Sequence, residues 1–247
     1  MCIRDRTRTD EIEQHRKTLM ELVVSENTGG APRNGQIDVN PLRGLKSGEL
    51  AELADRYQVD GRRFAGATSG TTNECDANPF ILRDYDKCIS CYRCVRVCAE
   101  REGDYAISVM NRGFKTQITT EFEGKLKDSS CTFCGQCVQT CPTGALADAK
   151  ALRAAEVPGE IKKTRTICPY CGVGCSVDLL TKGDQLVGVQ PAMDGPANVG
   201  ALCIKGQYAF DFVQHPDRLK TPMVRNASGD LEPASWDVAL DLSLIHI

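Results

Sequence analysis

Residues 88–98 read C-I-S-C-Y-R-C-V-R-V-C, and residues 131–142 read C-T-F-C-G-Q-C-V-Q-T-C-P. Every cysteine of the first run recurs 43 positions later in the second, so the stretch from Pro79 to about Leu152 is an internal duplication. Three cysteines at C-x2-C-x2-C spacing can bind three irons of a [4Fe–4S] cluster, and a fourth cysteine must bind the remaining iron. The sequence therefore predicts a module that holds two clusters.

The assignment of the fourth cysteines follows from a resemblance to bacterial two-cluster ferredoxins, in which the last cysteine of each run binds the other cluster. The resemblance implies two ligand sets: Cys88, Cys91, Cys94 and Cys141 for one cluster, and Cys131, Cys134, Cys137 and Cys98 for the other. The second run matches the C-x2-C-x2-C-x3-C-P pattern in full, with Gly135 and Pro142 in place. Tyr92 and Ala99 replace these residues in the first run, which we expect to affect packing or potential without removing a ligand.

A third group of cysteines has a different spacing, with Cys168, Cys171 and Cys175 followed 28 positions later by Cys203. These four thiolates predict a third [4Fe–4S] cluster. The sequences around them, C-P-Y-C-G-V-G-C and N-V-G-A-L-C-I-K-G, resemble the N-terminal cluster domain of molybdopterin-dependent oxidoreductases. A structural zinc module is the alternative for all three groups, although zinc usually pairs two C-x2-C knuckles across a longer gap.

The order of these modules resembles the α (catalytic) subunit of NAD-dependent and related cytoplasmic formate dehydrogenases, over nearly everything from His15 to Leu240. The resemblance implies a bis-molybdopterin guanine dinucleotide with molybdenum or tungsten in the full-length protein. It also implies formate as substrate and a diaphorase or other iron–sulfur or flavin subunit as electron acceptor. Lys205 matches the family lysine between cluster and pterin. The catalytic residues of the family would follow Leu240, so none is assigned here.

A non-catalytic electron-carrying subunit of a respiratory NADH dehydrogenase-like complex is the main alternative, since it would keep the same modules without pterin chemistry. Longer family members also bind a further cluster through a His and three Cys near the N-terminus. This chain has Asn27 at the histidine position and no cysteine in that region, so we expect that cluster to be absent.

Composition excludes several other classes of function. The chain has 30 basic and 33 acidic residues, well mixed, with a formal net charge of −3, so no basic stripe points to nucleic acid. No apolar run is long enough to span a membrane, and no export signal is visible. Twelve of the fourteen cysteines fall in metal-binding patterns, which favours a reducing compartment, and we expect a cytoplasmic protein.

These features predict an α+β architecture. We expect a helical segment at 7–66, with helices at 9–26 and after Ser47, a linker at 67–78, and the ferredoxin-like domain at 79–155. A helix and connector, ended by Val157-Pro158-Gly159, is expected over 147–160. A small β-rich cluster domain is expected at 161–222, with a strand at 164–167 and a hairpin at 176–190. Residues 223–241 should open a truncated molybdopterin domain. Residues 1–6 and 242–247 can be translated from opposite strands of one short DNA sequence, so we expect them to be sequencing scars on a fragment.

Overall fold

The structure is a computed structural model that describes residues 6–26, 49–59, 63–64, 78–121, 124–150 and 156–244. Its contacts divide the chain into two units, Met1–Phe210 and Asp211–Ile247, which are described separately. Asn27, most of the expected linker and the outer residues of both expected scars lie outside the described residues. Within the described ranges, no helix combines the length and the apolar character needed to cross a membrane.

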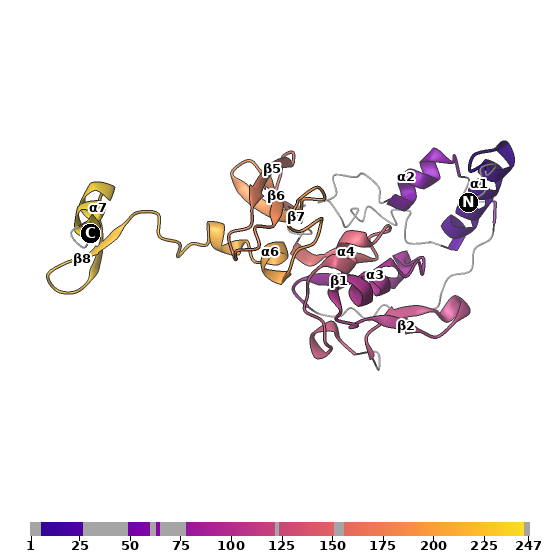
Figure 1. Cartoon of the computed structure of the whole chain (residues 1–247), viewed down its shortest axis with the longest axis horizontal. Helices are drawn as coiled ribbons and strands as arrows, with labels where there is room; N and C mark the ends of the chain where they lie inside the picture. Colours follow the sequence, from indigo (N-terminus) through magenta and orange to yellow (C-terminus); the bar gives the residue numbers. More distant parts are fainter. Residues whose placement is uncertain are drawn as a thin grey trace. The chain divides into compact units, whose positions relative to one another are not determined.

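Two helices form the N-terminal segment, α1 (Asp10–Glu26) and α2 (Glu49–Arg56) (Figure 1). The Ile12 amide donates to the Thr9 hydroxyl at 3.3 Å, so Thr9 caps α1. The segment is attached to the ferredoxin-like module through α2. The Leu50 amide donates to the Pro142 carbonyl at 3.1 Å, and Arg93 pairs with Glu49 at 2.6 Å.

The ferredoxin-like module is closed by pairing of its two ends. β1 (Ile81–Arg83) lies antiparallel to β4 (Leu146–Asp148), and β2 (Ser108–Met110) lies antiparallel to β3 (Gln117–Thr119). Short helical turns separate them: η2 (Tyr85–Lys87), η4 (Gly113–Lys115) and η6 (Leu126–Asp128). The core consists of Ile81, Ile107, Ile118, Leu126, Val138 and Tyr208, and five of the cysteines pack against it. This core therefore holds the cysteine runs in place.

The helix predicted over 147–160 begins too early. Ala147 and Asp148 belong to β4, where they pair with Leu82 and Ile81, and the helix starts at Ala149. The Asp148 carboxylate caps this helix by accepting from the Lys150 amide at 2.8 Å. Pairing with a strand more than 60 residues earlier in the chain overrides the local helix preference of this stretch.

The two halves of the duplication start their helices at equivalent positions and end them differently. α3 (Arg93–Arg96) continues without a break into a π-helix, η3 (Val97–Glu102), which ends at Gly103 with φ 75°. α4 (Gln136–Thr140) stops before Cys141, which is extended. Pro142 cannot continue a helix, whereas Ala99 at the equivalent position can. The missing proline in the first run thus lengthens a helix.

The third module is a three-stranded antiparallel sheet followed by a short helix (Figure 1). Its strands are β5 (Lys162–Ile167), β6 (Ser176–Lys182) and β7 (Gln185–Pro191), and α6 spans Ile204–Tyr208. The predicted strand and hairpin are confirmed, with the first strand beginning two residues earlier than expected. Leu180 and Val187 form one small core of this module, and Val177, Val189 and Leu202 form another.

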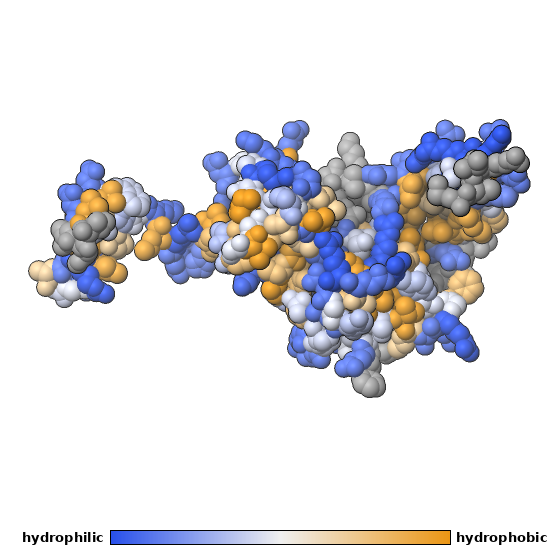
Figure 2. Space-filling view, viewed as in Figure 1, coloured by the Kyte–Doolittle hydropathy of each residue, from blue (hydrophilic) through white to orange (hydrophobic). Residues whose placement is uncertain are grey.

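The second unit contains η7 (Asp211–Gln214), the hairpin of β8 (Met223–Arg225) and β9 (Leu231–Pro233), and α7 (Trp236–Leu244). Asn226 shapes the hairpin turn, since its side-chain oxygen accepts from the Ser228 and Asp230 amides. Leu231, Trp236 and Val238 are each more than half exposed, and Figure 2 shows hydrophobic residues on the visible surface of this unit. Taken together, the described residues form a mixed helix and strand fold with small sheets, in agreement with the predicted class.

Candidate iron–sulfur sites

The two cysteine runs share one backbone conformation. Ser90 and Phe133 have φ values of 51° and 54°, and Tyr92 and Gly135 have φ values of 60° and 77°. Members of each pair are 43 positions apart, so the duplication visible in the sequence extends to the left-handed residues. Such residues turn the chain tightly between the cysteines. As a result the Phe133 amide donates to the Cys131 sulfur at 3.4 Å, and the Ser90 amide makes the equivalent bond to Cys88.

The first set of cysteines gathers around an apolar cavity. Its wall includes the first run and the second half of the duplication: Cys88, Cys91, Cys94, Cys137, Cys141, Pro142, Thr143, Ala145 and Leu146, with neighbouring side chains from the rest of the module. Burial raises the pKa of Cys94 to about 12, and the thiolates of Cys141, Cys88 and Cys91 add to the shift. Cys141 therefore lies beside the three cysteines of the other run, as the ferredoxin resemblance implies.

The second set behaves in the same way. Burial raises the pKa of Cys137 well above its usual value, and the neighbouring thiolates of Cys134, Cys94, Cys131 and Cys98 raise it further. Burial also raises the pKa of Cys134 to about 12. The structure thus brings Cys98 close to the second run, and Cys94 and Cys137 place the two sets next to each other.

These surroundings suit a four-iron cluster. Neighbouring buried thiols do not stabilise each other's thiolate form, so their pKa values are raised and they hold their protons. Metal cations must therefore displace these protons when the cysteines become ligands. Backbone amides already point at ligand sulfurs, as the Leu146 amide does toward Cys141 at 3.5 Å. The donor set, the cavity and the amide donors all fit an iron–sulfur cube held by thiolates. Among the described residues, no three His, Cys, Asp or Glu side chains converge closely enough to hold a single metal ion.

The third set of cysteines lies in one loop and at the N-terminus of one helix. Cys168, Cys171 and Cys175 lie in the connection between β5 and β6, and Cys203 immediately precedes α6. The Cys168 amide donates to the Cys175 carbonyl at 2.8 Å, which closes the loop. Burial raises the pKa of Cys175, and the thiolates of Cys168, Cys171 and Cys203 contribute. All four predicted ligands are therefore neighbours in space.

Asn198 holds the return loop in place, a role that the sequence reasoning missed. Its buried side-chain amide donates to the carbonyls of Ser176 and Ala201 at 3.2 and 2.9 Å, and its oxygen accepts from the Ser176 amide at 2.9 Å. A Cβ at Gly195 would collide with that same oxygen. These contacts connect the residues just before Cys203 with the residue just after Cys175. The N-V-G-A-L-C motif contains this asparagine and could have drawn attention to it.

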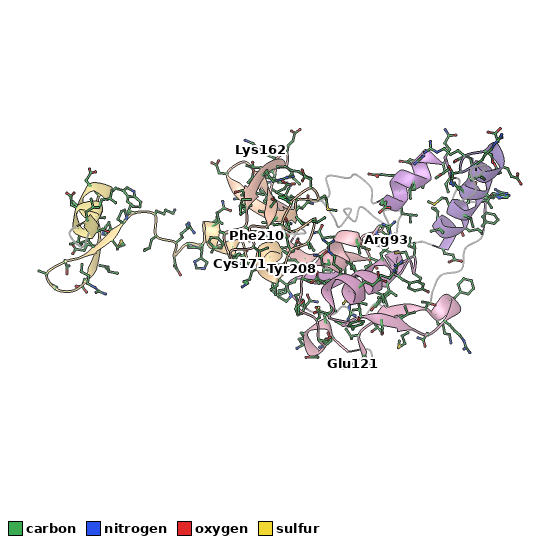
Figure 3. The ribbon with its side chains drawn as sticks, viewed as in Figure 1. Arg93, Glu121, Lys162, Cys171, Tyr208 and Phe210 are labelled. Carbon is green, nitrogen blue, oxygen red and sulfur yellow. The ribbon has the colours of Figure 1, made fainter. Side chains whose placement is uncertain are left out.

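The third module contacts the ferredoxin-like module through α6. The Gln139 side-chain amide donates to Gln207 at 3.2 Å, and Gln207 in turn donates to the Val189 carbonyl at 3.2 Å. A Cβ at Gly135 would lie 2.9 Å from the Tyr208 hydroxyl. Gly135 therefore allows close approach of Tyr208, in addition to adopting its left-handed conformation. Figure 3 marks Tyr208 on α6, where this helix approaches the ferredoxin-like module.

Lys205 lies on α6 with an exposed side chain, two residues after Cys203. The role that the family resemblance implies for it stays a prediction. Sequence reasoning also missed Tyr208, which is buried next to the second cysteine run.

Comparison with known proteins agrees with the cysteine geometry. Residues 161–215 match the family model of the molybdopterin oxidoreductase Fe4S4 domain, and residues 78–147 match that of the ferredoxin-like domain of NADH-quinone oxidoreductase subunit 3. The segments that carry the three cysteine groups are thus similar to iron–sulfur domains of oxidoreductases: the first two groups to a ferredoxin-like domain, and the third to a molybdopterin oxidoreductase Fe4S4 domain.

Individual relatives divide between two kinds of protein. The chain is 31% identical to an NADH-quinone oxidoreductase subunit of Rhizobium meliloti over 96% of its own length and 26% of that protein. It is 34% identical to a "Putative formate dehydrogenase" of Staphylococcus haemolyticus over 78% of its length and 23% of that protein. The chain therefore spans about a quarter of the curated relatives it matches. These matches support the wider family and do not single out formate dehydrogenase.

A solved structure is also similar, that of an NAD+-reducing [NiFe]-hydrogenase in the H2-reduced state. It matches with a TM-score of 0.46 and 23% identity over 57% of this chain and 56% of the hydrogenase chain.

Proposed function

We propose that this chain relays electrons through three [4Fe–4S] clusters in a formate dehydrogenase-like molybdenum or tungsten oxidoreductase. In this proposal electrons from formate oxidation at a pterin-bound metal pass to an acceptor subunit. The observation that carries it is the placement of Cys141 beside the first run and Cys98 beside the second. That arrangement supports the eight ligands predicted for the first two clusters, and the proximity of Cys168, Cys171 and Cys203 to Cys175 supports the four predicted for the third. The domain limits 79–155 and 161–222 are part of the proposal.

The chain's own residues would perform four tasks in the relay. Bound clusters supply one-electron storage, and the thiolates hold them. The left-handed residues aim backbone amides at the sulfurs, which stabilises negative charge there. The contact between Cys94 and Cys137 keeps the first two sets adjacent. The α6 contacts attach the third set to the second run. Together these features favour electron transfer along a series of neighbouring sites.

A second candidate is a non-catalytic electron-carrying subunit of a respiratory NADH dehydrogenase-like complex. The observation that favours it is coverage, since the match to the NADH-quinone oxidoreductase subunit extends over 96% of the chain and the formate dehydrogenase match over 78%. Both candidates require the same three clusters. They differ in whether a pterin-bound metal delivers the electrons.

Metal analysis of the anaerobically reconstituted chain tests the shared part of the proposal. We expect about twelve irons per chain from three four-iron clusters, together with brown absorbance near about 400 nm. Four or fewer irons, or stoichiometric zinc in a colourless sample, would contradict the cluster assignment and support a structural zinc module.

Experiments on the natural full-length protein distinguish the two candidate functions. If the formate proposal is right, the protein contains molybdenum or tungsten, and formate alone reduces the clusters, which is seen as new signals by electron paramagnetic resonance. Reduction by a diaphorase partner with NADH, in a protein that lacks both metals and ignores formate, would establish the electron-carrying subunit instead.

A further inference from the structure

Tyr208 is a buried polar group whose hydroxyl has no hydrogen-bond partner among the described residues. Its side chain is 1% exposed. Buried hydroxyls are normally paired, because leaving one unpaired costs the full penalty of removing it from water. Tyr85 illustrates the usual case, since it is also buried and its hydroxyl donates to the Ile118 carbonyl at 2.6 Å. The unpaired hydroxyl of Tyr208 therefore calls for a partner that the described part of the chain does not supply.

The contacts of Tyr208 hold its hydroxyl against the second cysteine run, at Gly135. A Cβ on Gly135, between Cys134 and Gln136, would lie 2.9 Å from the hydroxyl oxygen. The Tyr208 ring packs against Phe80 with 5.0 Å between ring centroids. A side-chain contact holds the end of the helix too, since the Lys150 ammonium donates to the Tyr208 carbonyl at 2.5 Å. Tyr208 therefore has little freedom to turn its hydroxyl elsewhere.

The charges around the hydroxyl indicate a hydrogen-bond acceptor in the second cysteine set. Burial raises the pKa of Tyr208 far above its ordinary value, and Asp148 and the thiolates of Cys137, Cys134 and Cys131 contribute. The phenol thus keeps its proton and faces negative charge that belongs to the second cysteine set. A protonated phenol can donate to a thiolate or sulfide sulfur.

We propose that Tyr208 donates a hydrogen bond to a sulfur of the cluster held by Cys131, Cys134, Cys137 and Cys98. This inference rests on the proposed function, because it requires that cluster. Tyr208 follows Cys203 by five positions on α6, so the bond connects the helix of the third site directly to the second cluster. A hydrogen bond to sulfur stabilises the reduced, more negative cluster and raises its reduction potential. Tyr208 would thus favour the second cluster as the electron acceptor of the third.

The test compares Tyr208→Phe with Tyr85→Phe in the reconstituted full chain, using redox titration followed by electron paramagnetic resonance. Cys134→Ser identifies the signal of the second cluster. We expect Tyr208→Phe to lower the potential of that cluster by about 59 mV, a tenfold change in a one-electron equilibrium. After exchange into D2O, electron paramagnetic resonance of the parent chain should show coupling between the second cluster and the deuteron on the Tyr208 hydroxyl. This coupling should be absent in Tyr208→Phe. Tyr85→Phe should weaken folding and leave this potential unchanged.

The outcomes separate this inference from the proposed function. A full iron content with an unchanged potential in Tyr208→Phe would overturn the inference alone. Failure of the parent chain to bind about twelve irons would instead overturn the proposed function. If Tyr208→Phe does not assemble, 3-fluorotyrosine replaces tyrosine in the parent chain. Fluorination makes the phenol a stronger donor and should raise the potential of the second cluster, and a constant potential would reject the proposal.

Discussion

Gly135 and Tyr92 occupy equivalent positions in the two cysteine runs, and both have positive φ values, 77° and 60°. Only Gly135 is covered, because Tyr208 and Gln207 pack against it, while the Tyr92 side chain remains 39% exposed. The two positions therefore share a backbone conformation and differ in what packs against them. The first run tolerates a side chain at this position, and the second leaves no room for one.

Gly135→Ala is expected to destabilise the reconstituted chain by more than about 2 kcal/mol, since the new Cβ adds a clash to a left-handed conformation that costs about 1–2 kcal/mol. Denaturant titration followed by loss of cluster absorbance measures the effect. The matched control is Tyr92→Gly, which relieves the same conformation without a clash and should change stability by less than about 1 kcal/mol. Equal effects of the two substitutions would contradict the role of Tyr208 packing.

At the scale of elements, the absence of a proline after Cys98 distinguishes the two halves. The helix that begins at Arg93 continues through η3 to Glu102, and it positions Arg101. The Arg101 guanidinium donates to the Val199 carbonyl at 2.6 Å, in the return loop of the third module. Ala99 thus permits an additional connection between the modules, which the sequence-based expectation of a packing or potential effect did not specify.

Ala99→Pro should break this connection. Proline within a helix removes one backbone hydrogen bond and costs about 3 kcal/mol or more. We expect faster amide hydrogen exchange over residues 97–103 and over the return loop near Val199. Ala99→Gly serves as the control, because it costs only about 1 kcal/mol and keeps the amide. Unchanged exchange near Val199 in the proline variant would show that Arg101 does not stabilise that loop.

At the scale of the whole molecule, the proposed ligand sets predict that each half of the duplication supplies one cysteine to the cluster of the other half. Cys141→Ser should therefore alter the same cluster signal as Cys91→Ser, although Cys141 belongs to the second run. Cys98→Ser should alter the signal that Cys134→Ser alters. Electron paramagnetic resonance of the reduced variants provides the comparison. If Cys141→Ser instead changes the signal assigned by Cys134→Ser, the ligand sets are not exchanged between the halves.

Cluster assembly should depend on pH. Since the pKa values of Cys94 and Cys134 are raised to about 12, their thiols are protonated at neutral pH, and ligation must release those protons. Iron and sulfide incorporation should therefore be more complete at about pH 8.5 than at about pH 7. A preassembled sample moved between the same buffers should keep its iron. Incorporation that is independent of pH would show that thiol deprotonation does not limit assembly.

The same shifts determine how the metal-free chain responds to alkali. A thiol with a raised pKa binds its proton more tightly in the folded state than in the unfolded state. For Cys94 this stabilisation is complete below pH 9.0 and is lost as pH rises through about 12. Metal-free chain should thus lose folding stability across that window.

Much of this protein was predictable from the cysteines. Ligand spacing is a local property of the sequence, so the three cysteine groups and the duplication could be inferred from it. The hairpin at 176–190 could be inferred from its strand pattern and its turn residues. The exchange of Cys98 and Cys141 between the clusters, which the ferredoxin resemblance implies, stays a prediction. The choice between a formate dehydrogenase and an electron-carrying subunit could not be predicted, because both kinds of protein share these modules.

The sequence by itself determined the kind of chemistry, because thiolates at these spacings select iron and a left-handed turn recurs wherever the spacing recurs. Tertiary structure alone decided that Leu146–Asp148 is a strand, that Asn198 secures the return loop, and that the Tyr208 hydroxyl is buried at Gly135. Each of these depends on a partner distant in the chain or on burial. No local pattern of residues specifies either one.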